Sequence, residues 1–217
     1  MNRDAIKIKV RETLNPYLGR FRRKQLLNTQ FTIISNNCWA GHVYRYYHLP
    51  YDTPTIGLYF FSEDYIKFIY NLRHYMDAEL RFIKYTDSKY SEEIVKSHQE
   101  EVPIGRLDDI EIVFLHYHSE KEAKEKWNRR KLRIHWDNLY FKMSEQNQCS
   151  LEHLKAFDRL DTSKKFVFVS KNYELTSQIL FKDSDSMGGG VSNDTTEFRR
   201  FISLTNWLNG KPFKLRQ

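Results

Sequence analysis

An apolar, β-branched run that stops abruptly in a polar turn constrains the fold of this chain more than any other segment. Phe31 to Ile34 have the composition of a buried strand, and Ser35 to Cys38 end it with small polar side chains. The aromatic-rich segment 39–49 then suits a helix. A strand, a tight turn and a helix in this order are typical of open α/β sheets, where ligands bind at the carboxyl ends of the strands.

The rest of the chain alternates strand and helix patterns in the same way. Further strands are expected at residues 55–60, 110–117, 139–143 and 166–170, and further helices at residues 62–76, 119–134, 151–160 and 196–208, with Ser62 and Ser119 as N-caps. Such alternation indicates βαβ units. We therefore expect a single three-layer, Rossmann-like α/β domain with a mostly parallel sheet and helices on both faces.

Composition indicates a globular protein and limits its class. The 217 residues suit one domain, and 40% of them are hydrophobic and 15% aromatic. No apolar run approaches the roughly 20 residues of a membrane helix. The first residues do not form a secretory hydrophobic stretch either, so a cytoplasmic location is expected.

The positive charge is concentrated at the N-terminus. Residues 3–24 hold eight basic residues and two acidic ones, and thus six of the seven net positive charges. Because the remaining chain is almost neutral, nucleic-acid binding is not expected. We divide the chain into a basic N-terminal helical arm (1–29) and an α/β domain (30–217). The arm either lies on an anionic membrane through residues 1–24 or covers the edge of the domain, and the second alternative is favoured because Pro16 interrupts a short apolar face.

The turn after the first strand is the first candidate site. A thiol in the first turn of a helix meets backbone N–H groups that favour the thiolate, so Cys38 is a candidate catalytic residue. Ser35, Asn36 and Asn37 are candidate ligand-binding residues, because amides and N–H groups there suit an oxyanion or a phosphate. The structural alternative is a small buried thiol beside asparagines that only form the turn.

Two further groups qualify as site residues. His116 and His118 share one face of the predicted strand 110–117, so His116 is a candidate general base beside Cys38, or a hydrogen-bonded strand-end histidine. Arg130 and Arg133 share one face of the following helix and suit a phosphate or carboxylate, while the flanking Trp127 and Trp136 suit a sugar or base. The alternative is a solvated charged face.

Some patterns have no catalytic interpretation. Cys38 and Cys149 lack a neighbouring ligand at zinc spacing, and no other metal motif is present, so no metal is predicted and the cofactor is unknown. The glycines 188–190 lack the Lys and Ser/Thr of a P-loop, and a flexible linker within a mobile loop is favoured there.

Several of these segments together resemble a bacterial family, the domain of unknown function 1919. The resemblance covers about residues 30–170 and is carried by residues 35–38, 54–60, 65–68, 103–105, 109–112 and 114–117, and by Ala123, Lys126, Trp127, Arg130, Arg133, Ile134 and Asn138. Members typically accompany capsule and exopolysaccharide biosynthesis genes. The resemblance implies a cytoplasmic protein of surface-polysaccharide assembly, and it adds Tyr117 and Asn138 to the ligand-binding candidates. Trp39 to Gly41 depart from the family, where relatives often have two glycines.

Two functions remain open from the sequence. The first is a transferase, acyltransferase-like, that acts on an activated or lipid-linked sugar and uses Cys38 or His116 for the chemistry, with Arg130 and Arg133 holding an anionic small molecule such as a sugar phosphate. The second is a non-catalytic binding or scaffolding protein of the polysaccharide assembly machinery, with its arm at the inner membrane face.

Overall fold

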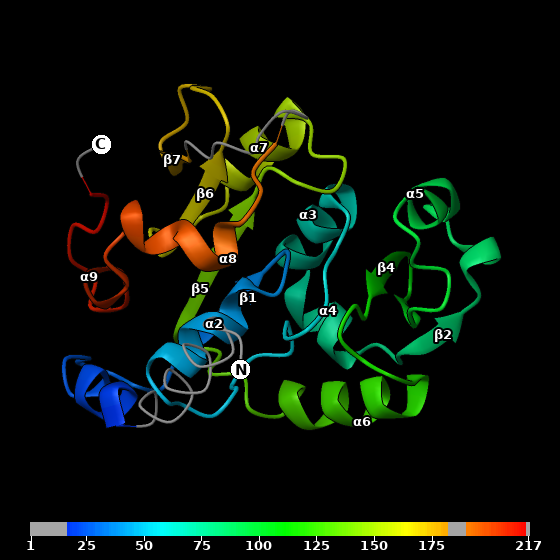
Figure 1. Ribbon diagram of the computed structural model, residues 1–217, viewed down its shortest axis with the longest axis horizontal. Helices are drawn as coiled ribbons and strands as arrows, with labels where there is room; N and C mark the ends of the chain where they lie inside the picture. The colour runs from blue at the N-terminus through cyan, green and yellow to red at the C-terminus, as the bar shows by residue number, and fades with distance from the viewer. Residues whose placement is uncertain (1–16, 182–189, 216–217) are drawn as a thin grey trace, which may run out of the picture.

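The computed structural model describes residues 17–181 and 190–215, and these form a mixed α/β domain with two sheets (Figure 1). Sheet A is parallel and has the order β1-β5-β6-β7. Sheet B is small and antiparallel, with the order β2-β3-β4. The predicted fold class is confirmed, because the larger sheet is parallel throughout.

Strands and helices are interspersed along the chain, with α6 and α7 connecting successive strands. The strands are β1 (Thr32–Ser35), β2 (Arg81–Ile83), β3 (Ile104–Leu107), β4 (Ile110–Val113), β5 (Leu139–Ser144), β6 (Lys165–Val169) and β7 (Gln178–Leu180). The helices are α2 (Trp39–Tyr46), α3 (Ser62–Tyr70), α4 (Leu72–Asp77), η1 (Tyr85–Asp87), α5 (Ser91–Lys96), α6 (Glu120–Lys131), α7 (Leu151–Asp158), α8 (Asp194–Glu197), η2 (Phe198–Arg200) and α9 (Leu204–Leu208). Residues 17–23 are also helical.

Apolar side chains on the two faces of sheet A form two separate cores. Helices cover both faces (Figure 1). On one face, Ile34, Met143 and Val167 of the sheet pack with residues of α3, α4, α6 and α7. On the other face, Ile33 and Phe166 pack with residues of α2, η2 and α9. Alternate residues of each strand serve the two cores, which is why the strands are apolar almost throughout.

The crossover from β1 to its neighbour β5 contains all of sheet B. The polar segment 86–101 forms part of η1 and all of α5 beside that sheet. Tyr59 pairs with Val113 of β4, and Phe60 donates its N–H to the Asn36 carbonyl at 2.9 Å. The short segment 57–60 thus joins the end of β1 to sheet B.

The strand predicted at residues 55–60 is absent, apart from the single bridge at Tyr59. Threonine side chains take its place along β1: the Thr53 hydroxyl donates to the Ile33 carbonyl at 2.6 Å, and Ser35 N–H donates to Thr55 Oγ1 at 3.2 Å. Pro54 between them has no N–H to donate. Side-chain hydrogen bonds therefore satisfy this edge of sheet A.

Other predicted elements differ in length or continuity. The strand 110–117 ends at Val113, the helix after Ser62 breaks at Asn71, and the C-terminal helix divides into α8, η2 and α9. Phe61, not Ser62, is the N-cap of α3, whereas Ser119 caps α6 as predicted by accepting from Glu122 N–H at 3.2 Å. The short strand β7 was not predicted.

The basic arm is described only in part. Residues 1–16, including Pro16 and half of the basic residues, lie outside the described residues, as do 182–189 with the first two glycines of the predicted loop. Within residues 17–181 and 190–215, no helix has the length and apolar character that crossing a bilayer requires.

Candidate functional site

The turn after β1 is built by its own side chains. The Ser35 hydroxyl donates to the Asn37 carbonyl at 2.6 Å and accepts from Ala40 N–H at 3.3 Å. Asn37 Oδ1 accepts from Trp39 N–H at 3.1 Å. These bonds occupy N–H groups at the start of α2 that would otherwise be free to bind an anion.

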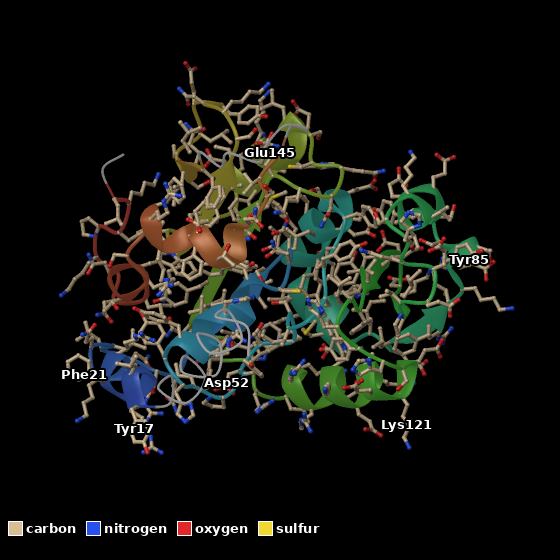
Figure 2. All side chains as sticks on the ribbon, viewed as in Figure 1. Tyr17, Phe21, Asp52, Tyr85, Lys121 and Glu145 are labelled. Carbon is tan, nitrogen blue, oxygen red and sulfur yellow. The ribbon has the colours of Figure 1, made fainter. Side chains whose placement is uncertain are left out.

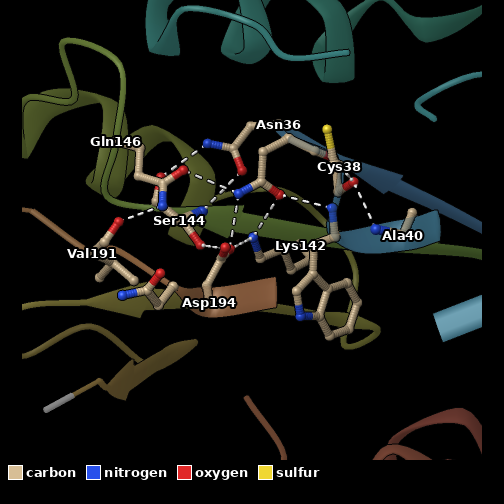
Figure 3. Close-up of polar contacts among 12 residues, drawn as sticks. Asn36, Cys38, Ala40, Lys142, Ser144, Gln146, Val191 and Asp194 are labelled. Atoms are coloured by element: carbon tan, nitrogen blue, oxygen red, sulfur yellow. Dashed lines mark hydrogen bonds and ion pairs between the residues drawn. The ribbon is translucent and has the colours of Figure 1, made fainter. Parts of the chain in front are cut away.

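A buried ion pair lies directly beneath this turn (Figure 3). Lys142 of β5 is fully buried, and its ammonium contacts the Asp194 carboxylate and Asn37 Oδ1, the latter at 3.0 Å. The Asp194 carboxylate also accepts from Ser144 Oγ at 2.6 Å and from Asn37 Nδ2 at 2.9 Å. We call Asn37, Lys142, Ser144 and Asp194 the buried network.

The charges in the buried network balance each other. Burial by itself would raise the pKa of Asp194, but Lys142, Asn37 and Ser144 together hold that pKa below its usual value. Asp194 is therefore ionised, and its charge opposes the loss of charge that burial promotes at Lys142. The network fastens α8 to β5 and to the turn after β1.

Asn36 also uses its side chain to hold the turn. Its Nδ2 donates to the Ser144 carbonyl at 2.9 Å, and its Oδ1 accepts from Ser144 N–H at 3.0 Å. This amide pair prolongs the contact between β1 and β5 by one residue. Ser35, Asn36 and Asn37, all predicted as ligand-binding residues, thus position the turn through internal hydrogen bonds.

Cys38 differs from these three because it is partly exposed and its thiol is only weakly engaged. Its Sγ lies 3.6 Å from the Leu58 carbonyl. Burial, with a smaller contribution from Asp194, raises the pKa of Cys38 to about 11. The thiol is therefore protonated at neutral pH, contrary to the helix-dipole argument from the sequence.

A second polar cluster lies beside Cys38, where α6 meets the segment before Leu58. The Tyr117 hydroxyl donates to the Ile56 carbonyl, and Arg130 Nη1 donates to the Tyr117 oxygen, both at 2.5 Å. Burial raises the pKa of Tyr117, and the nearby Cys38 adds to that rise. We call Cys38, Gly57, Tyr117 and Arg130 the arginine cluster.

The close approach of Tyr117 and His116 to the backbone at position 57 requires a glycine there. Its φ of +70° is strained for other residues, and a Cβ there would lie 3.1 Å from Tyr117 Cε2 and 3.4 Å from His116 Cβ. The Gly57 carbonyl also accepts from His116 N–H at 2.9 Å. The side chain of His116 is exposed, so it lies at the solvent-facing rim of the arginine cluster.

Arg130 has an unusual environment for a cation. It is 6% exposed, and within residues 17–181 and 190–215 it has no carboxylate partner, and its Nε has no hydrogen-bond partner. The neighbouring carboxylate, Asp52, instead lies 3.9 Å from Arg133 Nε and 3.2 Å from His135 Nε2. A guanidinium held in this way can receive an anion without first breaking an ion pair.

The remaining predicted residues lie farther from this point. Arg133 is one turn along from Arg130 and faces Asp52. Asn138 precedes β5, at the opposite end of sheet A from Cys38, and its side chain binds Lys164 Nζ at 2.7 Å and the Gln30 carbonyl at 2.8 Å. Trp127 is 1% exposed and belongs to the core, so it is not available to stack on a ligand.

The structure thus brings together Cys38, His116, Tyr117 and Arg130, although β1 and β4 lie in different sheets. Gly57, Lys142 and Asp194 were not predicted as site residues from the sequence. A lysine within the apolar strand 139–143 was the one signal for the buried network. Among the residues that the structure describes, no group of three or more His, Cys, Asp or Glu is placed to hold a metal ion.

Comparison with known proteins places these features in a family. The family model described as "Domain of unknown function (DUF1919)" matches residues 9–209, which include every residue of the two clusters. An uncharacterized protein of Haemophilus influenzae is 32% identical over 168 residues, which are 77% of this chain and 75% of that protein. Neither description states an activity.

Proposed function

The chain belongs to the family of the domain of unknown function 1919, and on that premise we propose that it is a group-transferring enzyme of surface-polysaccharide assembly that binds a phosphate-bearing sugar or an anionic donor at the arginine cluster. The assignment to surface-polysaccharide assembly rests on the resemblance of the sequence to the family. The choice of an anionic ligand rests on the residues themselves.

The observation that carries the proposal is the buried guanidinium of Arg130. Burying a cation is costly unless an opposite charge or strong hydrogen bonds compensate it. The Tyr117 and Ile56 oxygens compensate only in part, and neither carries a negative charge. A phosphate or carboxylate would supply the missing charge and would suit the planar fork of arginine.

The other residues of the cluster have roles that follow from their protonation and exposure. The Cys38 thiol, protonated at neutral pH, is a weak hydrogen-bond donor beside the ligand and not a nucleophile. His116, exposed at the rim, is the group we assign to proton transfer with the acceptor hydroxyl. The buried network keeps the turn with Cys38 in place beneath them.

A non-catalytic binding protein would use the same arginine cluster and differ only in its chemistry. Both functions require that an anion bind near Arg130, but only an enzyme releases a product from the donor. Binding and turnover therefore have to be measured on the same variants.

The test is ligand-dependent thermal stability followed by an assay for turnover. The purified full chain is heated with inorganic phosphate, a uridine diphosphate sugar, coenzyme A or acetyl-coenzyme A, and one of the anionic donors should raise its Tm. Arg130→Met should abolish that rise, and Arg129→Met, an exposed arginine on the same helix, should retain it. Donor cleavage, followed by mass spectrometry, should fall with Arg130→Met and with His116→Ala.

Three results would decide against parts of the proposal. A Tm unaffected by all four probes, or a rise that survives Arg130→Met, would remove the anion site. A rise lost in Arg130→Met without cleavage of any donor in the presence of oligosaccharide acceptors would favour the non-catalytic binding protein.

A further inference from the structure

The helical segment 17–23 presents large apolar side chains to solvent. Tyr17 is 71% exposed, Phe21 66% and Leu18 46%, and the spacing of these residues places them on one side of the helix. Figure 2 shows Tyr17 and Phe21 at the outer edge of the molecule, beyond α2. Isolated exposed hydrophobic residues are common, but three within five residues form a patch.

The opposite side of this segment, and the residues that follow it, contact the domain through hydrogen bonds and apolar packing. Arg22 Nη1 donates to the Tyr46 carbonyl at 3.3 Å, and Leu26 is buried in the core of α2 and α9. Asn209 Oδ1 accepts from Leu27 N–H at 2.8 Å, and Asn209 Nδ2 donates to the Gln25 carbonyl at 2.9 Å. The segment therefore covers the domain edge and still keeps an apolar side outward, which combines the two alternatives considered for the arm.

The surroundings of the patch carry positive charge without acidic neighbours in the sequence. Residues 17–51 contain five basic residues and no Asp or Glu. Arg20 and Lys24 are exposed within the segment itself. From η2, Arg199 adds its guanidinium 5.5 Å from the Tyr46 ring, which Arg22 covers at 4.1 Å. The N-terminal segment and η2 thus both contribute cations to one region of the surface.

We propose that the outer face formed by Tyr17, Leu18, Arg20, Phe21 and Lys24 docks on an anionic lipid bilayer. Aromatic side chains favour the boundary between headgroups and acyl chains, and flanking Lys and Arg side chains bind acidic headgroups. Nucleic acid would use the cations but would leave apolar Leu18 and Phe21 without a comparable environment. Charge and apolar exposure together therefore favour a bilayer.

The test is co-sedimentation of the full chain with vesicles. Vesicles of phosphatidylcholine with about 30% phosphatidylglycerol should bind the protein, and those of pure phosphatidylcholine should not, because each basic side chain near an anionic surface adds to the attraction. Binding should weaken as the salt concentration rises. Tyr17→Ser with Phe21→Ser, and separately Arg20→Glu with Lys24→Glu, should each lower the partition coefficient at least about tenfold.

Matched control variants distinguish binding through this surface from nonspecific adsorption to vesicles. Leu132→Ser changes an apolar side chain that is 82% exposed at the end of α6, and Lys121→Glu with Lys124→Glu reverses two exposed charges on that helix. Both controls should bind vesicles like the wild type. Circular dichroism of every variant should show an unchanged fold.

The proposal is overturned if neutral vesicles bind equally well, if the controls weaken binding as much as the outer-face variants, or if a short single-stranded RNA displaces the protein from anionic vesicles. None of its residues belongs to the arginine cluster. Loss of vesicle binding with an intact ligand-induced Tm rise, or the reverse, would therefore show which of the two proposals has failed.

Discussion

Two buried cations at neighbouring points of the fold have opposite environments. Lys142 is fully buried and is matched by the Asp194 carboxylate. Arg130 is almost as deeply buried, but among the described residues it is faced by the neutral oxygens of Tyr117 and Ile56 and by the Tyr51 ring at 5.5 Å, and not by a carboxylate. The comparison indicates that the lysine serves the fold, whereas the arginine is available to a ligand.

The choice of residue type agrees with this difference. A lysine ammonium is strongly hydrated and tolerates burial only with close polar partners. The Lys142 ammonium has two such partners, the Asp194 carboxylate and Asn37 Oδ1. Arginine is more weakly hydrated and remains protonated when buried, so its charge persists without a carboxylate.

The largest effect should come from removing the partner of Lys142. Asp194→Ala leaves a buried ammonium without its carboxylate, so we expect the free energy of unfolding to fall by about 3–5 kcal/mol in urea denaturation. Glu152→Ala, which breaks the exposed pair with Lys155, should change it by no more than about 0.5 kcal/mol.

Replacing both partners sharpens this result. The double variant Lys142→Met with Asp194→Leu should recover much of the lost stability, because no uncompensated charge remains. A loss of less than about 1 kcal/mol in Asp194→Ala would contradict the assignment of the pair as a structural one.

Replacing the other buried cation, Arg130, should lower the stability by a smaller amount. Arg130→Met removes hydrogen bonds to neutral oxygens but strands no carboxylate among the described residues, and the Tyr117 hydroxyl keeps its bond to Ile56. The free energy of unfolding should therefore fall by less than about 2 kcal/mol. A loss as large as that of Asp194→Ala, measured in the same urea titration, would end the contrast between the two cations.

The smallest predicted effect is a dependence of the free energy of unfolding on pH. The pKa of Asp194 is lower in the folded than in the unfolded chain, so its ionisation stabilises the fold above the unfolded-state pKa. That contribution disappears as the pH falls through the lowered folded-state pKa. The stability difference between wild type and Asp194→Asn should thus narrow between about pH 5 and pH 2. A constant difference for Asp194→Asn over this range would contradict the charged pair.

Local patterns were sufficient to predict several elements. The apolar runs that became β1, β5 and β6 are each buried on both faces, so composition alone identifies them. The cap at Ser119 depends on a bond to a residue only three positions away. The fold class follows from such elements in alternation.

The pairing of distant residues could not be predicted in the same way. Lys142 and Asp194 are 52 positions apart, and Asp194 is the last residue of the segment 183–194 whose composition predicts a mobile loop. The strand expected at residues 55–60 failed because hydroxyls of Thr53 and Thr55 compete with backbone pairing. Of sheet B, the strand at β4 was predicted, whereas β2 and β3 were missed because such short strands resemble loop segments.

The turn after β1 shows which properties depend on local sequence and which depend on the tertiary structure. The sequence by itself determined that Ser35 to Cys38 end a buried strand and begin a helix, because that outcome depends on neighbouring residues and their hydrogen bonds. Only the tertiary structure decided that Asn36 and Asn37 hold the turn and that Cys38 stays protonated near Tyr117. Burial and the position of distant charges control those properties, and both arise only when the chain is folded.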